Sequence, residues 1–270
     1  MFRAFFGVKG EHRSPDGRQV NAVRGTLDLL SRLLETRRPK SLAIATDEDW
    51  RPAWRVEALP TYKAHRVAEP VPPGLIPQLP LIERVLRALG LNVIGKSGFE
   101  AEDIIASLAS RLPRPIEIYS GDRDLFAVVR GGDVVVLYPE KGGLAVVDEG
   151  EIERRYGIPG RSYADFAVLR GDPSDGLPGV PGVGPKTAAG LLRRHGGLDG
   201  VLKGLDWGPA TRDYIQRARK VVQPVPDLEL PEPRPGLRPP ADLEALEKLS
   251  RELGIGPYSS RLLKALSASA

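Results

Sequence analysis

Acidic residues gather at four places in the chain, each next to the end of a predicted strand or helix. The set comprises Asp47, Glu100, Glu102, Asp103, Asp122, Asp124, Asp172 and Asp175. In an open parallel sheet, ligand sites lie beyond the carboxyl ends of the strands, so acids that follow different strands can meet there. Crowded carboxylates repel one another unless cations neutralise them. Oxygen ligands without cysteine favour Mg²⁺ or Mn²⁺, and two such ions about 3.5–4 Å apart are the usual device for hydrolysing phosphodiesters.

Each acid taken alone also fits a simpler role. Asp is favoured at the starts of helices, so Asp122 and Asp172 could each be an N-cap, and most acids lie on the solvated surface. The coincidence of four clusters at the ends of elements is what favours a two-metal site.

A loop rich in Gly and Pro follows the last acidic pair, in the stretch PGVGPKTAAGLL. Gly182 and Gly184 permit a close approach of the backbone to a ligand, and Pro185 suits the first turn of a helix. The free N–H groups of that helix, with Lys186 and the Thr187 hydroxyl, predict an anion site. No base-reading pattern stands nearby, so any binding through phosphates is expected to be largely independent of sequence. The spacing is not that of a P-loop, and the loop taken alone also fits a plain turn.

The elements that must position these groups alternate along the first half of the chain. Apolar residues at helical spacing predict helices over residues 21–36, 79–89, 100–111 and 125–130. Short apolar runs predict strands over residues 41–46, 91–94, 116–119 and 134–138. This alternation indicates an α/β domain with a parallel sheet.

After about residue 150 the pattern becomes helical. Helices are predicted over residues 151–156, 163–170, 186–195 and 212–222. Seven prolines between Pro224 and Pro240 predict an extended linker, and a last helix is expected over residues 241–253. We therefore predict an α/β domain over residues 1–150 and a helical domain over residues 151–270.

The composition limits the classes of function. The 270 residues are 41% hydrophobic and 27% charged, as in a soluble globular protein. The absence of cysteine excludes disulfides, thiolate zinc sites and iron–sulfur clusters. No apolar run is long enough to span a bilayer and the N-terminus does not resemble a secretory signal, so we expect no membrane association and a cytoplasmic location.

The net charge of +4 is unevenly distributed. Residues 1–66 carry 13 Lys and Arg against 8 Asp and Glu, and residues 177–223 carry 8 against 3. Basic surface on two separate segments suits a polyanion that touches both, although charge alone also fits a purely solubilising role.

The order of the motifs FEAED, SGDRDL and GDPSDGLPGVPGVGPKTA resembles the 5′-nuclease (flap endonuclease) family. The likeness is to the bacterial branch that occurs as the N-terminal domain of DNA polymerase I and as stand-alone enzymes. It runs over nearly the whole chain, from FRAFF through YKAHR to RRHGGL. The resemblance implies a PIN-like α/β nuclease domain followed by a helix–three-turn–helix (SAM-like) domain, with that motif at about residues 165–222.

The resemblance also implies roles for individual residues. Acids at the eight positions named above surround two divalent ions, although bacterial members usually carry Asp where this chain has Glu102. Lys63 and Arg66 in YKAHR, with Arg3 in FRAFF, approach the scissile phosphate. Tyr62 stacks on the terminal base. The loop at residues 182–187 holds duplex backbone, often with a bound K⁺ ion.

One departure from the family pattern concerns the N-terminus. Family members begin with an apolar strand that ends in Asp-Gly a few residues before the stretch matching FRAFF, whereas here Met1 directly precedes that stretch. We expect the natural protein to be longer, with apolar residues and Asp-Gly encoded in frame upstream. The rival hypothesis is a natural loss of this strand and of its metal-binding aspartate, which would leave a weakened nuclease or a DNA-junction binder.

The function that this reasoning predicts is divalent-metal-dependent hydrolysis of DNA at 5′ ends and 5′ flaps. The expected partners are single-strand/duplex junctions and RNA primers in replication and repair, with the protein acting as a monomer at the nucleoid. Three alternatives stay open: a catalytically silent junction-binding protein, a PIN-type ribonuclease, and a base-excision glycosylase. The glycosylase leaves the upstream acids unexplained.

Overall fold

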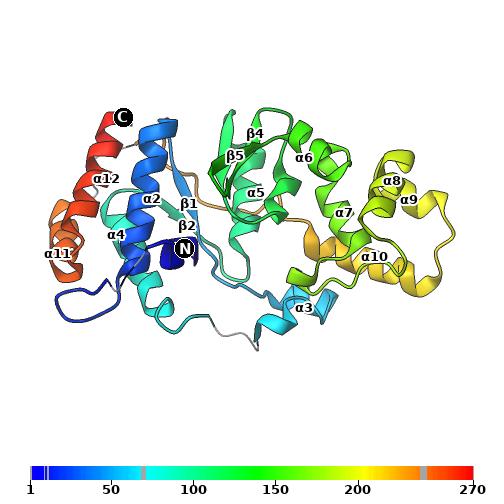
Figure 1. Cartoon of the computed structure of the whole chain (residues 1–270), viewed down its shortest axis with the longest axis horizontal. Helices are drawn as coiled ribbons and strands as arrows, with labels where there is room; N and C mark the ends of the chain where they lie inside the picture. The colour runs from blue at the N-terminus through cyan, green and yellow to red at the C-terminus, as the bar shows by residue number, and fades with distance from the viewer. Residues whose placement is uncertain (1, 9, 11, 68–70, 238–241, 270) are drawn as a thin grey trace. The chain divides into compact units, whose positions relative to one another are not determined.

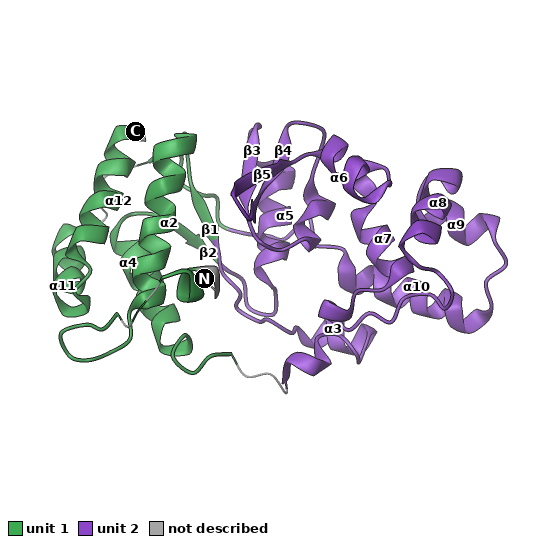
Figure 2. Ribbon diagram, viewed as in Figure 1, with its two compact units in different colours: residues 1–44, 69–94, 231–270 green, residues 45–68, 95–230 purple. Residues whose placement is uncertain are grey.

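The structure is a computed structural model that describes residues 2–8, 10, 12–67, 71–237 and 242–269 (Figure 1). The chain forms two compact units that interleave along the sequence. Unit 1 comprises residues 1–44, 69–94 and 231–270, and unit 2 comprises residues 45–68 and 95–230 (Figure 2). The predicted division at about residue 150 stays a prediction, because unit 2 itself extends across that position.

Unit 1 is built mainly of helices. They are α1 (Phe2–Gly7), α2 (Asn21–Arg37), α4 (Leu79–Ala88), α11 (Leu243–Leu253) and α12 (Gly256–Ser269), with a 3₁₀ turn at Ile76–Gln78. Strand β1 (Ala43–Ala45) pairs with β2 (Asn92–Ile94). Leu27 and Leu34 of α2 and Val85 of α4 are buried in one apolar core, because residues at helical spacing share a face. Helix α12 packs against α2 (Figure 1).

Unit 2 contains a three-stranded sheet, which positions Asp122 and Asp124 just after its first strand. Its strands are β3 (Ile116–Tyr119), β4 (Val134–Glu140) and β5 (Gly143–Val147). β3 runs parallel to β4, with Ile116 opposite Val134, and β4 runs antiparallel to β5. The predicted parallel pairing is thus confirmed for β3 and β4, and the sheet as a whole is mixed. Helix α5 (Ala101–Arg111) and the 3₁₀ helix η3 (Asp124–Val128) belong to the same unit.

The remainder of unit 2 is helical. It comprises α3 (Ala53–Ala58), η1 (Ala64–Val67), α6 (Glu149–Tyr156), η4 (Gly160–Ser162), α7 (Tyr163–Arg170), η5 (Pro173–Asp175), α8 (Pro185–His195), α9 (Leu198–Gly204) and α10 (Pro209–Val222). An aromatic cluster joins the sheet region to α7: the rings of Phe126 and Tyr163 lie edge to face at 5.2 Å. Such pairs stabilise a core beyond the area they bury.

The sequence predicted most of these elements, with three corrections. Residues 125–130 were expected to form an α-helix, but the structure has the 3₁₀ helix η3 there. Strand β5 and helices α1, α3, α9 and α12 were not predicted. No helix in the described part of the chain is long and apolar enough to cross a membrane.

The third correction concerns the start of the proline-rich segment: described residues 224–237 contain no helix or strand, as an extended linker requires, but the first part is bound to α5. The Ser107 hydroxyl of α5 donates to the carbonyl of Val225 at 2.7 Å, and the Leu228 amide donates back to that hydroxyl at 3.1 Å. Arg111 donates to the Leu230 carbonyl at 3.1 Å. Residues 224–230 therefore lie along α5, because proline carbonyls and the intervening amides still accept and donate hydrogen bonds.

Candidate active site

Three of the predicted acids converge on one point. Carboxylate oxygens of Glu102, Asp122 and Asp124 all lie within 4.8 Å of one another. Glu102 stands in the first turn of α5, and the two aspartates follow β3. The turn after β3 is held by short-range bonds: the Asp122 amide donates to the Ser120 hydroxyl and the Asp124 amide donates to Oδ1 of Asp122, both at 3.0 Å. The sequence therefore delivers both carboxylates to the carboxyl end of this strand.

The acidic pair after α7 extends this cluster. The carboxyl groups of Asp175 and Asp124 lie close enough to share a hydrogen bond when one of them carries a proton, and Asp175 is 5% exposed. Asp172 caps the η5 turn, because its Oδ1 accepts the Ser174 amide at 3.0 Å, and its Oδ2 accepts from Arg170 at 3.0 Å. Asp175 is thus adjacent to Asp124 of the cluster, whereas the Asp172 carboxylate is bonded to its own loop and to α7.

Gly176 brings this loop against the turn that carries Lys63. Its backbone has φ +72°, and a Cβ there would lie 2.0 Å from the carbonyl oxygen of Thr61. The Lys63 amide donates to the Asp175 carbonyl at 3.0 Å. Glycine is therefore required both by the left-handed conformation and by the close approach of the two backbones.

The carboxylates of Glu100 and Asp103 are already occupied by cations. Glu100 is bound by Arg55 and Lys63, and it accepts a hydrogen bond of 2.5 Å from the Tyr62 hydroxyl. Asp103 accepts from Arg55 at 2.7 Å. Both acids are buried, at 3% and 0% exposed. Their predicted role as metal ligands therefore competes with ion pairs that the chain itself provides.

The chain's own cations neutralise the acid cluster only in part, with Arg55 at 3.3 Å from Glu102 and Arg66 at 3.1 Å from Asp175. Burial, with the nearby charges of Asp175 and Asp122, raises the pKa of Asp124 well above its usual range. Burial also raises the pKa of Glu102 to about 8, although Arg55 acts in the opposite direction. Burial disfavours the charged form of Lys63, but Glu102 and Glu100 outweigh it and raise the Lys63 pKa. A cluster of this kind favours bound cations.

Other predicted residues lie at the margin of the cluster or away from it. Asp47 is exposed, and its Oδ1 accepts the Ala101 amide at 2.8 Å, so it sits at the start of α5. Arg66 is 41% exposed and donates to Asp175 at 3.1 Å and to the Ser174 carbonyl at 2.8 Å. Arg3 lies in α1 of unit 1, and its side chain is outside the described part of the structure.

Tyr62 requires a correction. Its ring is 1% exposed and its hydroxyl is bonded to Glu100. The ring is closed to a nucleotide base in this structure, so we no longer expect Tyr62 to stack on one.

The Gly-rich loop forms an exposed hairpin between η5 and α8. Gly182, Gly184, Lys186 and Thr187 are exposed, whereas Val183 is buried. Gly182 has φ +77°, and Gly184 is the N-cap of α8 with Pro185 in the first turn. The free N–H groups of the helix therefore point to solvent, as predicted for a phosphate site.

Sequence reasoning missed Arg55, which links the acids of α5. It lies in α3 and is 0% exposed. A signal was available in the stretch AWRVEALP, where Arg55 shares a helix face with the buried Leu59 four positions later.

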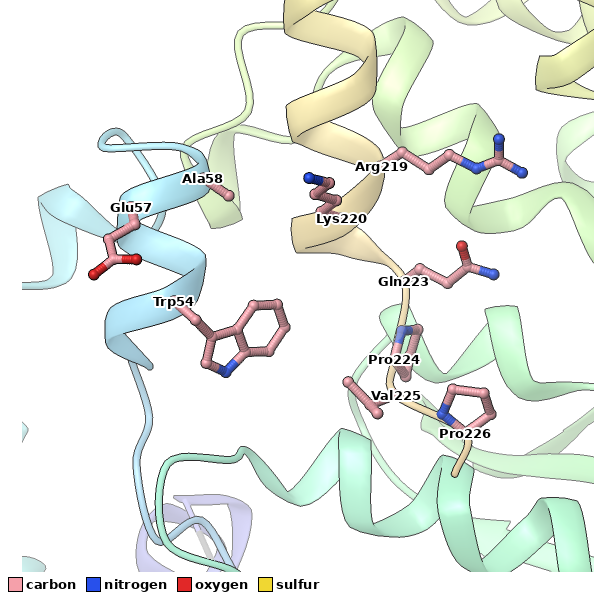
Figure 3. Close-up of a pocket in the computed structure, with 9 residues that line it drawn as sticks. All are labelled: Trp54, Glu57, Ala58, Arg219, Lys220, Gln223, Pro224, Val225 and Pro226. Atoms are coloured by element: carbon pink, nitrogen blue, oxygen red, sulfur yellow. The ribbon is translucent and has the colours of Figure 1, made fainter. Parts of the chain in front are cut away.

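A groove of about 670 Å³ opens elsewhere in unit 2, and Figure 3 shows Trp54 of α3 facing the segment at Pro224 and Pro226. Arg219 and Lys220 of α10 line it as well. None of the predicted site residues lines this groove, so the acidic cluster is the better candidate for the chemistry.

Comparison with known proteins agrees with the motif order. The family model described as 5′-3′ exonuclease, N-terminal resolvase-like domain, matches residues 1–157, and the C-terminal SAM fold of the same family matches residues 158–229. The chain belongs to the 5′-3′ exonuclease family. It is therefore a 5′ nuclease with a resolvase-like (PIN-like) α/β domain and a SAM-fold domain.

Individual relatives support the same assignment for this family member. A 5′-3′ exonuclease of Streptomyces coelicolor is 47% identical, over 99% of this chain and 97% of that protein. A 5′-3′ exonuclease of Mycobacterium tuberculosis is 43% identical, over 98% of this chain and 94% of that protein. Among solved structures, a bacteriophage T5 flap endonuclease in complex with DNA and metal ions has the same fold, with a TM-score of 0.62 at 14% identity over 91% of both chains.

Proposed function

We propose that this family member is a Mg²⁺- or Mn²⁺-dependent nuclease that hydrolyses DNA at 5′ ends and at 5′ flaps. The observation that carries the proposal is the convergence of Glu102, Asp122 and Asp124, with Asp175 adjacent to Asp124. Relatives named 5′-3′ exonuclease support the polarity of the reaction. The T5 flap endonuclease of the same fold was solved with DNA and metal ions, which supports a junction substrate.

The donor set fits two hard divalent ions. All the converging ligands are carboxylate oxygens, which Mg²⁺ and Mn²⁺ prefer. Glu102, Asp122 and Asp124 would hold one ion, and the Asp124–Asp175 pair, with Asp172 beside it, would hold the second. When bound, such ions supply an activated water and neutralise charge on the phosphate oxygens.

Basic side chains on the turn after α3 would orient the phosphate. Arg66 is exposed beside Asp175, so its remaining donors can reach a phosphate oxygen and offset charge that develops there. Lys63 is 7% exposed and bound to Glu100, so it would have to leave Glu100 to contact the substrate. Its left-handed backbone, with φ +47°, is a conformation that non-glycine residues adopt at an energetic cost, typically at functional sites.

The hairpin before α8 would hold the duplex part of the substrate. The exposed residues Gly182, Gly184 and Lys186, with the Thr187 hydroxyl, suit a phosphate backbone. A K⁺ ion beside the phosphate would take oxygen ligands, such as that hydroxyl and carbonyl groups of the same loop. Contacts of this kind carry no base information, so we propose binding that is independent of sequence. We also propose that the protein acts on RNA primers, that it acts as a monomer, and that it is located at the nucleoid.

Lys186→Ala is expected to weaken binding of a junction DNA and to reduce the slope of log K against log salt by about one. The reason is the loss of one phosphate contact at the start of α8. Lys248→Ala is the matched control, because Lys248 is 71% exposed on α11 and carries the same charge. Fluorescence anisotropy over a salt series measures the affinity and the salt slope of each variant. An unchanged slope for Lys186→Ala would remove the hairpin from the proposed interface.

Cleavage of a labelled 5′-flap duplex, with Mg²⁺ and with EDTA, tests the proposed function. We expect products released from the 5′ side with Mg²⁺ and no cleavage with EDTA. Junction binding without cleavage at any Mg²⁺ or Mn²⁺ concentration would contradict a nuclease and favour a silent junction-binding protein.

A further inference from the structure

The Arg55 side chain occupies an unusual place for a charge. It is 0% exposed, and its guanidinium contacts the three acids of the FEAED motif. One nitrogen, Nη1, pairs with Oε2 of Glu100. The other, Nη2, lies 2.7 Å from Oδ1 of Asp103 and 3.3 Å from Oε1 of Glu102. A buried charge of this kind is stable only when several partners compensate for its lost hydration.

Aromatic rings fix the plane of this guanidinium. Its central carbon lies 4.6 Å from the ring centroid of Trp54 and 5.8 Å from that of Tyr62. Guanidinium groups are attracted to the faces of such rings, more so where water is excluded. Arg55 therefore has little freedom to turn away from the acids.

The contacts divide the three acids into two kinds. Oε1 of Glu100 binds Lys63, and Oε2 binds Arg55 and the Tyr62 hydroxyl. Asp103 uses Oδ1 for Arg55 and the Val225 amide at 2.9 Å, and Oδ2 for the Glu100 amide at 3.2 Å. Both oxygens of each carboxylate are thus engaged.

Glu102 is the third acid, and its situation differs. Its contact with Arg55 is longer, at 3.3 Å, and its carboxylate also lies within the 4.8 Å cluster with Asp122 and Asp124. Glu102 therefore sits between the fixed guanidinium and the two aspartates that follow β3.

We propose that Arg55 is a positioning residue for the metal site, and that it acts through Glu102. By neutralising Glu100 and Asp103 it holds the first turn of α5 in place, and by its longer contact it orients the Glu102 carboxylate toward Asp122 and Asp124. The inference rests on the proposed function in assuming divalent ions at this cluster. Outer partners of metal ligands act in this way, and their loss costs about 10–100-fold in metal affinity or activity.

The geometry requires arginine. Its planar fork offers two nitrogens in a fixed arrangement, one for each anchoring carboxylate, whereas a lysine ammonium is a single point charge. Arg55→Lys therefore keeps the positive charge but cannot make the simultaneous contacts with Glu100, Asp103 and Glu102.

The proposal is tested by isothermal titration calorimetry, which measures Mn²⁺ binding to the full chain without DNA. We expect Arg55→Lys to bind Mn²⁺ about 10–100-fold more weakly than the unchanged chain. Arg51→Lys is the matched control, because the Arg51 guanidinium donates to the carbonyls of Tyr62 and Pro60 rather than to a carboxylate. Wild-type affinity in a folded Arg55→Lys protein would overturn the proposal.

A double-variant cycle separates positioning from a general structural role. Glu102→Gln alone should weaken Mn²⁺ binding, and Arg55→Lys should add little further loss in that background, because the two residues act as one unit. Losses that multiply independently would overturn the route through Glu102. If Arg55→Lys does not fold, Asp103→Asn is the second variant, because it removes the charge that anchors Nη2 of Arg55. We expect Asp103→Asn to lower the Mn²⁺ affinity several-fold. An Asp103→Asn protein with wild-type Mn²⁺ affinity would overturn the proposal.

The outcome is distinguishable from failure of the proposed function. Mn²⁺ titration needs no turnover, so an Arg55-dependent Mn²⁺ site in a chain that does not cut flap DNA would support the positioning role and reject the nuclease activity. If the chain cuts flap DNA but its Mn²⁺ affinity does not depend on Arg55, the nuclease activity is supported and the positioning role is rejected.

Discussion

Asp122→Ala is expected to reduce 5′-flap cleavage by at least about 1000-fold while leaving junction binding within a factor of two or so. The variant removes one of the three converging carboxylates and also the acceptor for the Asp124 amide. Binding is expected to persist because the exposed hairpin before α8 contributes phosphate contacts of its own. Single-turnover cleavage and anisotropy on the same flap substrate measure the two effects.

Asp133→Ala is the matched control for this loss. Asp133 is an exposed aspartate in the turn before β4, so the same change in charge there should leave cleavage intact. If Asp122→Ala lost cleavage and binding to the same degree, with an altered circular dichroism spectrum, the result would indicate collapse of the turn after β3 rather than removal of a ligand.

Arg55→Met is expected to produce the largest loss of stability, about 3–5 kcal/mol in the free energy of unfolding. The substitution leaves Glu100 and Asp103 buried with one cation fewer, and the neighbouring Glu102 loses its opposing charge as well. For a chain of this size that corresponds to a fall of roughly 10 °C in melting temperature. Thermal unfolding followed by circular dichroism measures it.

Arg154→Met provides the comparison. Arg154 pairs with Glu151 on the surface, with its side chain 71% exposed. Surface pairs contribute about 0–1 kcal/mol, so this variant should melt close to the unchanged chain. Equal melting temperatures for the two variants would mean that the Arg55 cluster does not stabilise the fold.

Local patterns predicted the elements that carry the acids. Apolar residues at helical spacing in AEDIIASLASR mark α5, and the run IEIY marks β3. Because β3 ends directly before SGDRD, the placement of Asp122 and Asp124 at one end of the sheet followed from chain order alone. Their convergence with Glu102 did not follow from chain order, because β2, the strand before α5, belongs to a different sheet from β3.

Contacts between distant segments were not predictable in this way. Which acids of FEAED face the cluster depends on Arg55, which lies 45 positions before Glu100 in the sequence. The burial of Tyr62 has the same origin, because its ring packs among residues from α3 and α5. Periodicity reports which face of an element is apolar, and it does not report which charge from elsewhere will pair with a buried carboxylate.

Strand β5 escaped prediction for a local reason. The strand GLAVV is apolar on both faces, because Leu144 and Val146 are 41% and 49% exposed whereas Val147 is buried, so the alternation of apolar and polar residues that marks a half-buried strand is missing. The strand is held by backbone pairing with β4, with Val136 opposite Val147.

The attachment of residues 224–230 to α5 bears on where a shortened chain can end. The Val225 amide donates to Asp103, the Leu228 amide donates to Ser107, and the Leu230 carbonyl accepts from Arg111. A truncated chain that ended after α10 would lack these partners of α5. Asp103, which anchors Arg55, would then lose the hydrogen bond from the Val225 amide. The smallest fragment able to preserve the carboxylate arrangement should therefore retain residues up to 230, a limit close to the family match that ends at residue 229.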